Sequence, residues 1–324
     1  MNLLNILCNR CCLIMKRDNR IRSVLAALLL FVSSSVLVAD DDVINEMVVF
    51  GASYSDTGNV FLATGFAIPL SPPYFAGRFS NGPVWHEIVA SELGIAAAQP
   101  DLIGGTNYAW GGAQTGEGLG ILGVPNLGLQ IDTFLARAVP RADQLFLVVG
   151  GGNDLIQPVP PTPPEQIVGN IAGHITELAE AGARYFAVPN LPTIPDFPFV
   201  ALLDDATVTE LARLTARTNR VLRPRLRKLE NELKNAGLNV EIAHVNWNRS
   251  FRFLLKFPSL IGVEDTTGTA LVPADCPPCT GILAPDPNVF FWFDNLHATA
   301  PVHEALGYFA LHDIRRQLFD DDDD

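Results

Sequence analysis

A candidate nucleophile stands early in the 324-residue sequence, in the segment VVFGASYSDTGN. Ser53 follows an apolar run at 45–50 that predicts a buried strand. At the carboxyl end of such a strand, a serine faces the edge where open α/β sheets bind ligands. The residues after it predict a turn that opens a helix, whose first N–H groups would face a developing oxyanion. Alone this pattern is weak, because buried strands followed by Gly/Ser turns are common.

An acid and a base stand close together near the other end of the chain. Asp294 lies three residues before His297, just ahead of a helix predicted at 301–319. At this spacing one turn can present both side chains to one pocket. The carboxylate would fix the imidazole tautomer while the other ring nitrogen accepts a proton from a serine hydroxyl. An aspartate that only caps the helix, followed by an unrelated histidine, gives the same pattern.

Two glycine-containing segments offer hydrogen-bond donors for an oxyanion. Residues 150–152 are three glycines at the end of a predicted strand, and Asn153 after them carries an amide donor. The segment NYAWGGA at 107–113 holds the adjacent Gly111 and Gly112, which would allow the backbone to approach a ligand closely. Both segments are also ordinary turn sequences, so neither identifies a site by itself.

The elements that must position these residues alternate along the chain. Apolar runs rich in β-branched residues predict strands at 45–50, 144–149, 183–188 and 239–244. Helical patterns lie between and after them, at 83–93, 164–181, 207–236 and 301–319. This alternation predicts an α/β fold, a three-layer α/β/α sandwich with a mainly parallel sheet. Pro224 is expected to kink the third helix.

Long Gly- and Pro-rich loops separate the regular elements, at 64–78, 111–128, 157–164, 189–198 and 263–287. Such loops on an α/β scaffold usually form the ligand site rather than domain linkers. We therefore expect one domain at 40–320, followed by an acidic tail at 321–324.

Composition excludes several classes of partner. The formal net charge is −13, so neither nucleic acid nor an anionic membrane surface is an expected partner. Part of that charge lies in the aspartate runs at 40–42 and 320–324, which are interpreted as solvated tails. They lack the spaced ligands and turn glycine of a calcium loop.

The N-terminus has the order of a secretory signal. Basic residues at 16–22 precede an apolar stretch at 24–38 that ends at Ala39, which predicts residues 1–39 as a signal peptide cleaved near Ala39. The stretch is short for a membrane span of roughly 20 residues. The protein is therefore expected to be secreted or periplasmic. Met15 is an alternative start, which would make residues 1–14 an upstream extension.

Only two cysteines would remain in the exported chain, Cys276 and Cys279. In an exported protein a CxxC within a Pro-rich loop favours a local disulfide over a redox centre. A zinc site would need two further ligands, and no second CxxC or HxxxH accompanies the pair.

The four motifs in this order, with Pro73-Tyr74 and the run GRFSNGPVW at 77–85, resemble the GDSL-type, or SGNH, hydrolases. The resemblance covers essentially the whole mature chain and points to the branch of secreted lipases, phospholipases, haemolysin-like proteins and acetylesterases. It implies the flavodoxin-like SGNH-hydrolase fold. It also implies Ser53 as nucleophile, His297 as general base and Asp294 as its orienting carboxylate.

The same resemblance implies an oxyanion hole made of the Ser53 N–H, the Gly112 N–H and the Asn153 side chain. Gly111 is the alternative to Gly112, because the register of the adjacent pair is not fixed. No metal or organic cofactor is expected.

Two positions depart from the family pattern. Ala52 stands where an aspartate usually precedes the serine, and Ala298 where proline often follows the histidine. The order Ser, Asp, His also fits α/β-hydrolases, but there the serine lies centrally in GxSxG and the histidine far from the acid.

The expected function is hydrolysis of carboxylic esters through an acyl-enzyme. Apolar loops at 119–129, 156–164 and 197–203 favour lipid or other hydrophobic esters, with peripheral contact to lipid aggregates. A carbohydrate acetylesterase and a lipid acyltransferase are alternatives that use the same triad. An inactive lipid-binding protein of the same fold is the alternative from another class. The sequence leaves the oligomeric state open.

Overall fold

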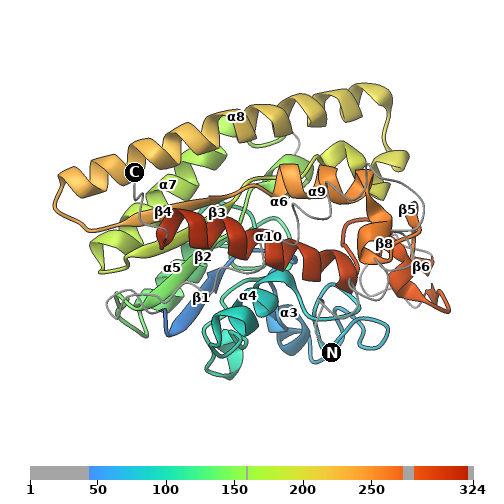
Figure 1. Ribbon diagram of the computed structural model, residues 1–324, viewed down its shortest axis with the longest axis horizontal. Helices are drawn as coiled ribbons and strands as arrows, with labels where there is room; N and C mark the ends of the chain where they lie inside the picture. The colour runs from blue at the N-terminus through green and yellow to red at the C-terminus, as the bar shows by residue number, and fades with distance from the viewer. Residues whose placement is uncertain (1–43, 158–159, 273–280, 320–324) are drawn as a thin grey trace, which may run out of the picture. The chain divides into compact units, whose positions relative to one another are not determined.

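A sheet of four parallel strands forms the centre of the protein (Figure 1). The computed structural model describes residues 44–157, 160–272 and 281–319. The strands follow one another in the order β1 (Glu46–Phe50), β2 (Gln144–Val148), β3 (Tyr185–Pro189) and β4 (Glu241–Val245). The four predicted strands are therefore confirmed, each to within two residues. Because all four run the same way, their carboxyl ends meet at one edge.

A further extended segment lies beside β1 on the side away from β2. Tyr108 donates its backbone N–H to the Val49 carbonyl at 2.7 Å, and Trp110 donates to the Gly51 carbonyl at 3.0 Å. The segment pairs parallel to β1 through Asn107. Its carboxyl end therefore delivers Gly111 to the same edge of the sheet as Ser53.

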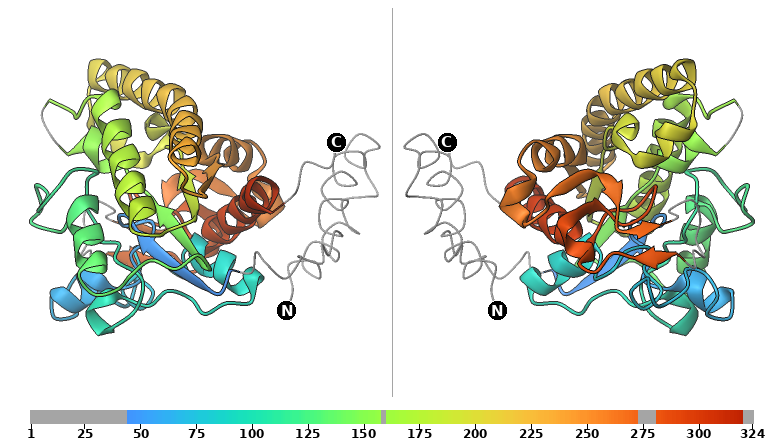
Figure 2. Two further views of the ribbon diagram at one scale, coloured as in Figure 1. Left: turned by 90° about the vertical axis from the view of Figure 1, so that its left-hand side faces the viewer. Right: turned by 90° about the vertical axis from the view of Figure 1, so that its right-hand side faces the viewer.

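Alternation along the strands builds two cores. Val48 and Phe50 of β1 face one core, whereas Met47 and Val49 face the other. The first core is covered by α5 (Leu127–Leu135), α7 (Pro164–Glu180) and α8 (Asp205–Asn235). The second is covered by α4 (Trp85–Leu93), α9 (Trp247–Lys256) and α10 (Ala300–Leu318). The result is the predicted three-layer α/β/α sandwich (Figure 2).

The four predicted helices correspond to α4, α7, α8 and α10. Helix α8 forms because buried leucines recur every three or four residues, and because the Asp204 side chain accepts the Thr207 N–H at 2.8 Å. It continues as one helix through Pro224. The sequence patterns did not predict α5, which follows a loop, or α9, which a single residue separates from the end of β4.

The expectation of a loop at 263–287 is wrong in part. The described residues there form β5 (Asp265–Thr269), β6 (Leu271–Val272) and β7 (Ile282–Leu283), and β8 (Phe290–Trp292) follows. Strand β5 pairs with β8 in parallel, outside the central sheet. This pairing fixes the chain just before Asp294.

Several sequence predictions concern residues outside the described ranges. The signal peptide at 1–39, the acidic tail at 321–324 and the pair Cys276 and Cys279 all belong to them. Within the part of the chain that the structure describes, no helix has the length and apolar character needed to cross a membrane.

Close packing of α4 against α10 depends on Gly307. A Cβ at this position would lie 2.6 Å from the Ile88 Cβ and 2.7 Å from the Trp85 carbonyl oxygen. We predict that Gly307→Ala lowers the free energy of unfolding by about 1–3 kcal/mol, because the helices must separate. Gly173→Ala in α7, where a Cβ meets nothing within 4 Å, should instead raise it by about 0.5–1 kcal/mol. Urea unfolding measures both, and equal effects would contradict this packing argument.

Candidate active site

The turn that carries Ser53 is held by main-chain hydrogen bonds. The Ala52 carbonyl accepts the N–H groups of Ser55 at 2.9 Å and Asp56 at 3.0 Å. Just before the turn, the buried Gln130 side chain accepts the Gly51 N–H and donates to the Gly51 carbonyl, both at 2.9 Å. The side chain at position 52 contributes to none of these bonds. An alanine there is therefore compatible with the turn.

Asp56 connects this turn to two other segments. Its Oδ1 accepts the N–H groups of Gly58 and Asn59 at 2.7 Å each, and its Oδ2 accepts those of Val60 at 3.3 Å and Gly111 at 2.9 Å. Burial raises the pKa of Asp56 to about 6, although these four N–H groups favour the charged form. The carboxylate thus caps α3 (Asn59–Ala63) and fixes the glycine loop.

This arrangement corrects one expectation. Helix α3 begins six residues after Ser53, and the N–H groups at its start donate to Asp56. They are therefore engaged inside the protein and do not face a ligand beside the serine.

The two candidate glycines differ in their surroundings. The Gly111 N–H donates to Asp56, and a Cβ on Gly111 would lie 2.5 Å from the Phe79 ring. Gly112 has φ +88°, which favours glycine, and its carbonyl accepts from the Gln157 amide at 3.0 Å. Among the described residues, the Gly112 N–H donates to no protein acceptor. Of the two glycines, Gly112 is therefore the one whose N–H is not already bonded within the described part of the protein.

Asp294 and His297 form a buried pair directly after β8. The His297 Nδ1 lies 2.9 Å from Oδ1 and 2.8 Å from Oδ2 of Asp294. Oδ1 also accepts the backbone N–H of His297 at 2.7 Å and that of Leu296 at 2.8 Å, so one tight turn carries both residues. Because the carboxylate engages Nδ1, Nε2 is the ring nitrogen left to act as a base.

Tyr74 adds a further hydrogen bond to the acid, donating from its hydroxyl to Asp294 Oδ2 at 2.7 Å. Burial raises the pKa of Asp294, but the charge of His297 and the hydrogen bonds from His297 and Tyr74 outweigh it. The net pKa lies below the ordinary value, and the carboxylate is ionised at neutral pH. This hydrogen bond gives a physical role to Tyr74, which the sequence showed only as part of a motif.

A cleft at the carboxyl edge of the sheet brings Ser53, Asn153 and His297 together. The Asn153 Nδ2 donates one hydrogen to the Ala113 carbonyl at 2.8 Å, which leaves its second hydrogen for another acceptor. Asp294 is buried behind His297, and Ala113 lines the cleft next to Gly112. Gly112 itself is not among the residues that line the cleft. Within the described residues, no hydrogen bond joins Ser53 to His297; in ligand-free enzymes this bond is often long.

The apolar wall of the cleft comes from several loops and from the start of α9. Its members are Ile156, Leu191, Ile194, Phe197, Phe199, Trp247 and Leu296. Two of the three apolar loops expected to line an acyl groove contribute, through Ile156 and through Phe197 and Phe199. The loop at 119–129 contributes no lining residue among those described.

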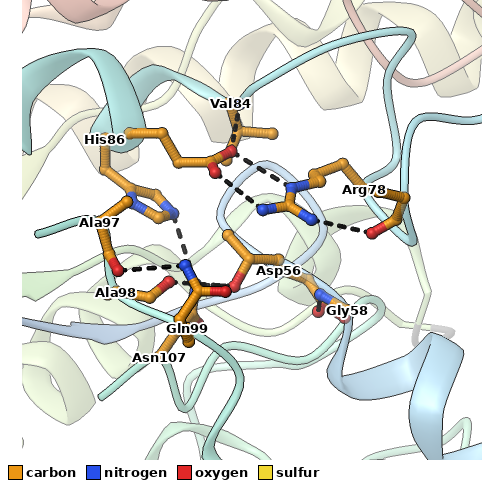
Figure 3. A network of polar contacts seen from close by, with 12 residues as sticks. Asp56, Gly58, Arg78, Val84, His86, Ala97, Ala98, Gln99 and Asn107 are labelled. Carbon is orange, nitrogen blue, oxygen red and sulfur yellow. Dashed lines mark hydrogen bonds and ion pairs between the residues drawn. The ribbon is translucent and has the colours of Figure 1, made fainter. Parts of the chain in front are cut away.

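A buried polar network contacts the residues that follow Ser53 in the nucleophile turn (Figure 3). The Asn107 amide donates to the Ser55 carbonyl at 2.7 Å and to the Thr57 hydroxyl at 2.9 Å, and it lies 3.4 Å from His86 Nε2. His86 also contacts the Ser55 carbonyl, at 3.0 Å. Burial lowers the pKa of His86, so it stays neutral as a structural group.

Sequence reasoning missed the roles of Asp56, Gln130 and Tyr74. Asp56 had a recognisable local signal, because aspartate side chains in turns often accept the backbone N–H two residues further along, here that of Gly58, the N-cap of α3. Tyr74 and Gln130 act across 220 and 79 positions of sequence, and no local pattern marks such contacts.

A family model described as GDSL-like Lipase/Acylhydrolase matches residues 47–308, which include Ser53, Asp294 and His297. The chain belongs to the GDSL-like lipase/acylhydrolase family. It is accordingly a carboxylic ester hydrolase, and the resemblance inferred from the motifs is confirmed.

Relatives of this GDSL-like chain lie in the lecithinase and haemolysin-like branch. It is 28% identical over 245 residues to a phosphatidylcholine-sterol acyltransferase from Aeromonas hydrophila, covering 74% of this chain and 69% of that protein. It is 32% identical over 162 residues to the thermolabile hemolysin of Vibrio parahaemolyticus, covering 48% of this chain and 36% of the hemolysin. The match thus spans about a third of the hemolysin's length.

Solved structures with a similar fold include a carbohydrate acetylesterase from Sinorhizobium meliloti. It is 15% identical, with a TM-score of 0.46, and the match covers 85% of this chain and 100% of that one.

The role of Asp56 in the GDSL-like chain can be tested by Asp56→Asn. Both oxygens of Asp56 accept N–H groups, so an amide nitrogen would face at least one donor. We predict a loss of about 2–3 kcal/mol in the free energy of unfolding at pH 7. Asp265 accepts the N–H groups of Thr267 and Gly268 through Oδ1 alone, which an asparagine can still supply. Asp265→Asn should therefore cost less than about 1 kcal/mol, and equal losses in urea unfolding would refute the argument.

Proposed function

We propose that Ser53 is the nucleophile of a secreted serine esterase, with His297 as general base and Asp294 as the carboxylate that orients it. The observation that carries this proposal is the buried Asp294–His297 pair, whose imidazole lines the cleft that also contains Ser53. The Asp294 carboxylate holds Nδ1 in its protonated form and stabilises the imidazolium that forms when Nε2 accepts the serine proton.

Catalysis proceeds in two acyl-transfer steps. The Ser53 oxygen attacks the ester carbonyl while its proton passes to His297, and the imidazolium then protonates the leaving alcohol. Water, activated by the same imidazole, attacks the acyl-enzyme and releases the acid. Both tetrahedral intermediates carry an oxyanion, which needs donors that are already in place.

The Ser53 N–H, the Gly112 N–H and the Asn153 amide are the proposed oxyanion donors. Gly112 is favoured over Gly111 because the Gly111 N–H is already bound to Asp56. Asn153 is favoured because its bond to the Ala113 carbonyl orients the amide at the cleft and leaves one hydrogen unused.

An ester of a hydrophobic acid is the proposed substrate class. Large apolar side chains from 156, 191–199, 247 and 296 line the cleft, and few charged groups accompany them. This wall favours an acyl chain over a carbohydrate, whose hydroxyls need polar partners. The predicted signal peptide supports export, which would give the enzyme access to extracellular or periplasmic lipid.

Transfer of the acyl group to an alcohol is the second candidate, because the relative from Aeromonas hydrophila is named an acyltransferase. It uses the same acyl-enzyme, with an alcohol in place of water. A new ester formed when an alcohol acceptor is supplied would distinguish transfer from hydrolysis.

The proposal is tested with p-nitrophenyl esters from acetate to octanoate. We expect kcat/KM to rise with acyl length, because the apolar wall gains contact with each added methylene. Ser53→Ala should lower the activity on every ester by at least about 10³-fold. Ser91→Ala, at an exposed position in α4, is the matched control and should change nothing.

Two results would count against these assignments. Activity retained by a folded Ser53→Ala variant would remove the nucleophile. A sharp fall in kcat/KM beyond acetate would favour an acetylesterase instead.

A further inference from the structure

An uncharged hairpin at 118–125, here called the apolar hairpin, has the sequence GLGILGVP. It exposes three aliphatic side chains within four residues: Leu119 is 64% exposed, Ile121 60% and Leu122 63%. Single exposed aliphatic residues are common on protein surfaces, but neighbours grouped on one element usually mark an interaction site. The apolar hairpin contributes no lining residue to the cleft, so the proposed chemistry does not use it.

Hydrogen bonds hold the apolar hairpin in this shape. Gly120 donates its N–H to the Val124 carbonyl at 2.8 Å, and Asn126 donates its N–H to the Gly118 carbonyl at 2.9 Å. The Asn126 side chain in turn accepts the Gln114 N–H at 2.9 Å. The backbone therefore holds the three side chains exposed to water, where they do not gain the favourable free energy of burial.

The apolar hairpin borders the cleft. The side chain of Leu122 lies against Gly112, since a Cβ built on Gly112 would be 2.8 Å from Leu122 Cδ1. The next residue, Ala113, lines the cleft beside Ser53. A surface that covers the hairpin would thus lie at the mouth of the cleft.

We propose that the apolar hairpin docks on the surface of aggregated zwitterionic lipid, which carries no net charge, and brings the cleft to its ester substrate there. This inference rests on the proposed function. The charge of the protein favours zwitterionic over anionic lipid as the partner. The hairpin has no charged residue, and a chain with net charge −13 is repelled by an anionic lipid surface. Leu119, Ile121 and Leu122 would pass into the acyl region and leave water.

The test uses a variant that changes only the exposed tips, Leu119→Ser with Ile121→Ser, and leaves Leu122 beside Gly112 intact. The matched control is Val139→Ser: Val139 is 77% exposed and lies in the turn before β2, at the opposite edge of the sheet. Flotation with phosphatidylcholine vesicles measures binding, and hydrolysis of soluble p-nitrophenyl butyrate measures the active site separately.

We expect the double variant to bind vesicles at least tenfold more weakly than the parent and to hydrolyse the soluble ester within twofold of it. Val139→Ser should match the parent in both assays. Binding that is unchanged in the double variant, or absent in the parent, would overturn the proposal. So would sedimentation showing that the hairpin substitutions dissociate a dimer, because the hairpin would then bind a second copy of the chain.

Binding is scored without catalysis, so this outcome is separate from that of the proposed function. Failure of Ser53→Ala to abolish hydrolysis would refute the nucleophile and leave the vesicle result standing.

Discussion

Four backbone N–H groups donate to one buried carboxylate, Asp56, at the edge of the sheet that carries the proposed active site. Asp56 joins the turn that carries Ser53, the start of α3 and the loop that carries Gly111 and Gly112. A shared acceptor thus fixes the relative positions of these segments. The Gly111 N–H donates to Asp56, whereas the N–H of the adjacent Gly112 has no acceptor among the described residues. This bond is the reason for placing Gly112, and not Gly111, in the proposed oxyanion hole.

A second buried carboxylate, Asp294, fixes the proposed base, His297, in the same way. Asp294 accepts from the His297 ring, from backbone N–H groups of its own turn and from the Tyr74 hydroxyl. Both oxygens of each aspartate accept hydrogen bonds, but the two aspartates have different roles. Asp56 positions backbone, whereas Asp294 sets the tautomer of an imidazole. In this chain the Ala52 carbonyl accepts the N–H groups of Ser55 and Asp56, so position 52 is bonded into the turn through its backbone.

The sequence predicted those parts of the fold that depend on local pattern. Buried strands and long amphipathic helices have strong periodicity, and β1–β4, α4, α7, α8 and α10 appear where periodicity placed them. The alternation of strands and helices also predicted that the strands of the sheet run parallel. Strand β5 was not predicted, because it is stabilised by pairing with β8, which is distant in sequence. Helix α9 was overlooked although it is at least as long as α4, is amphipathic and begins at a local cap, Asn246. The motif residues were identified, Tyr74 among them, but the hydrogen bonds that Tyr74 and Gln130 make across the fold were not predicted.

The central claim is that the pair Asp294–His297 activates Ser53. Labelling with a fluorophosphonate, followed by peptide mapping in a mass spectrometer, tests it most directly. The account predicts one adduct per chain, on the peptide that contains Ser53, and its loss in a folded His297→Ala variant. A chain that takes up no label, labels a different serine, or labels Ser53 equally fast without His297 would contradict it.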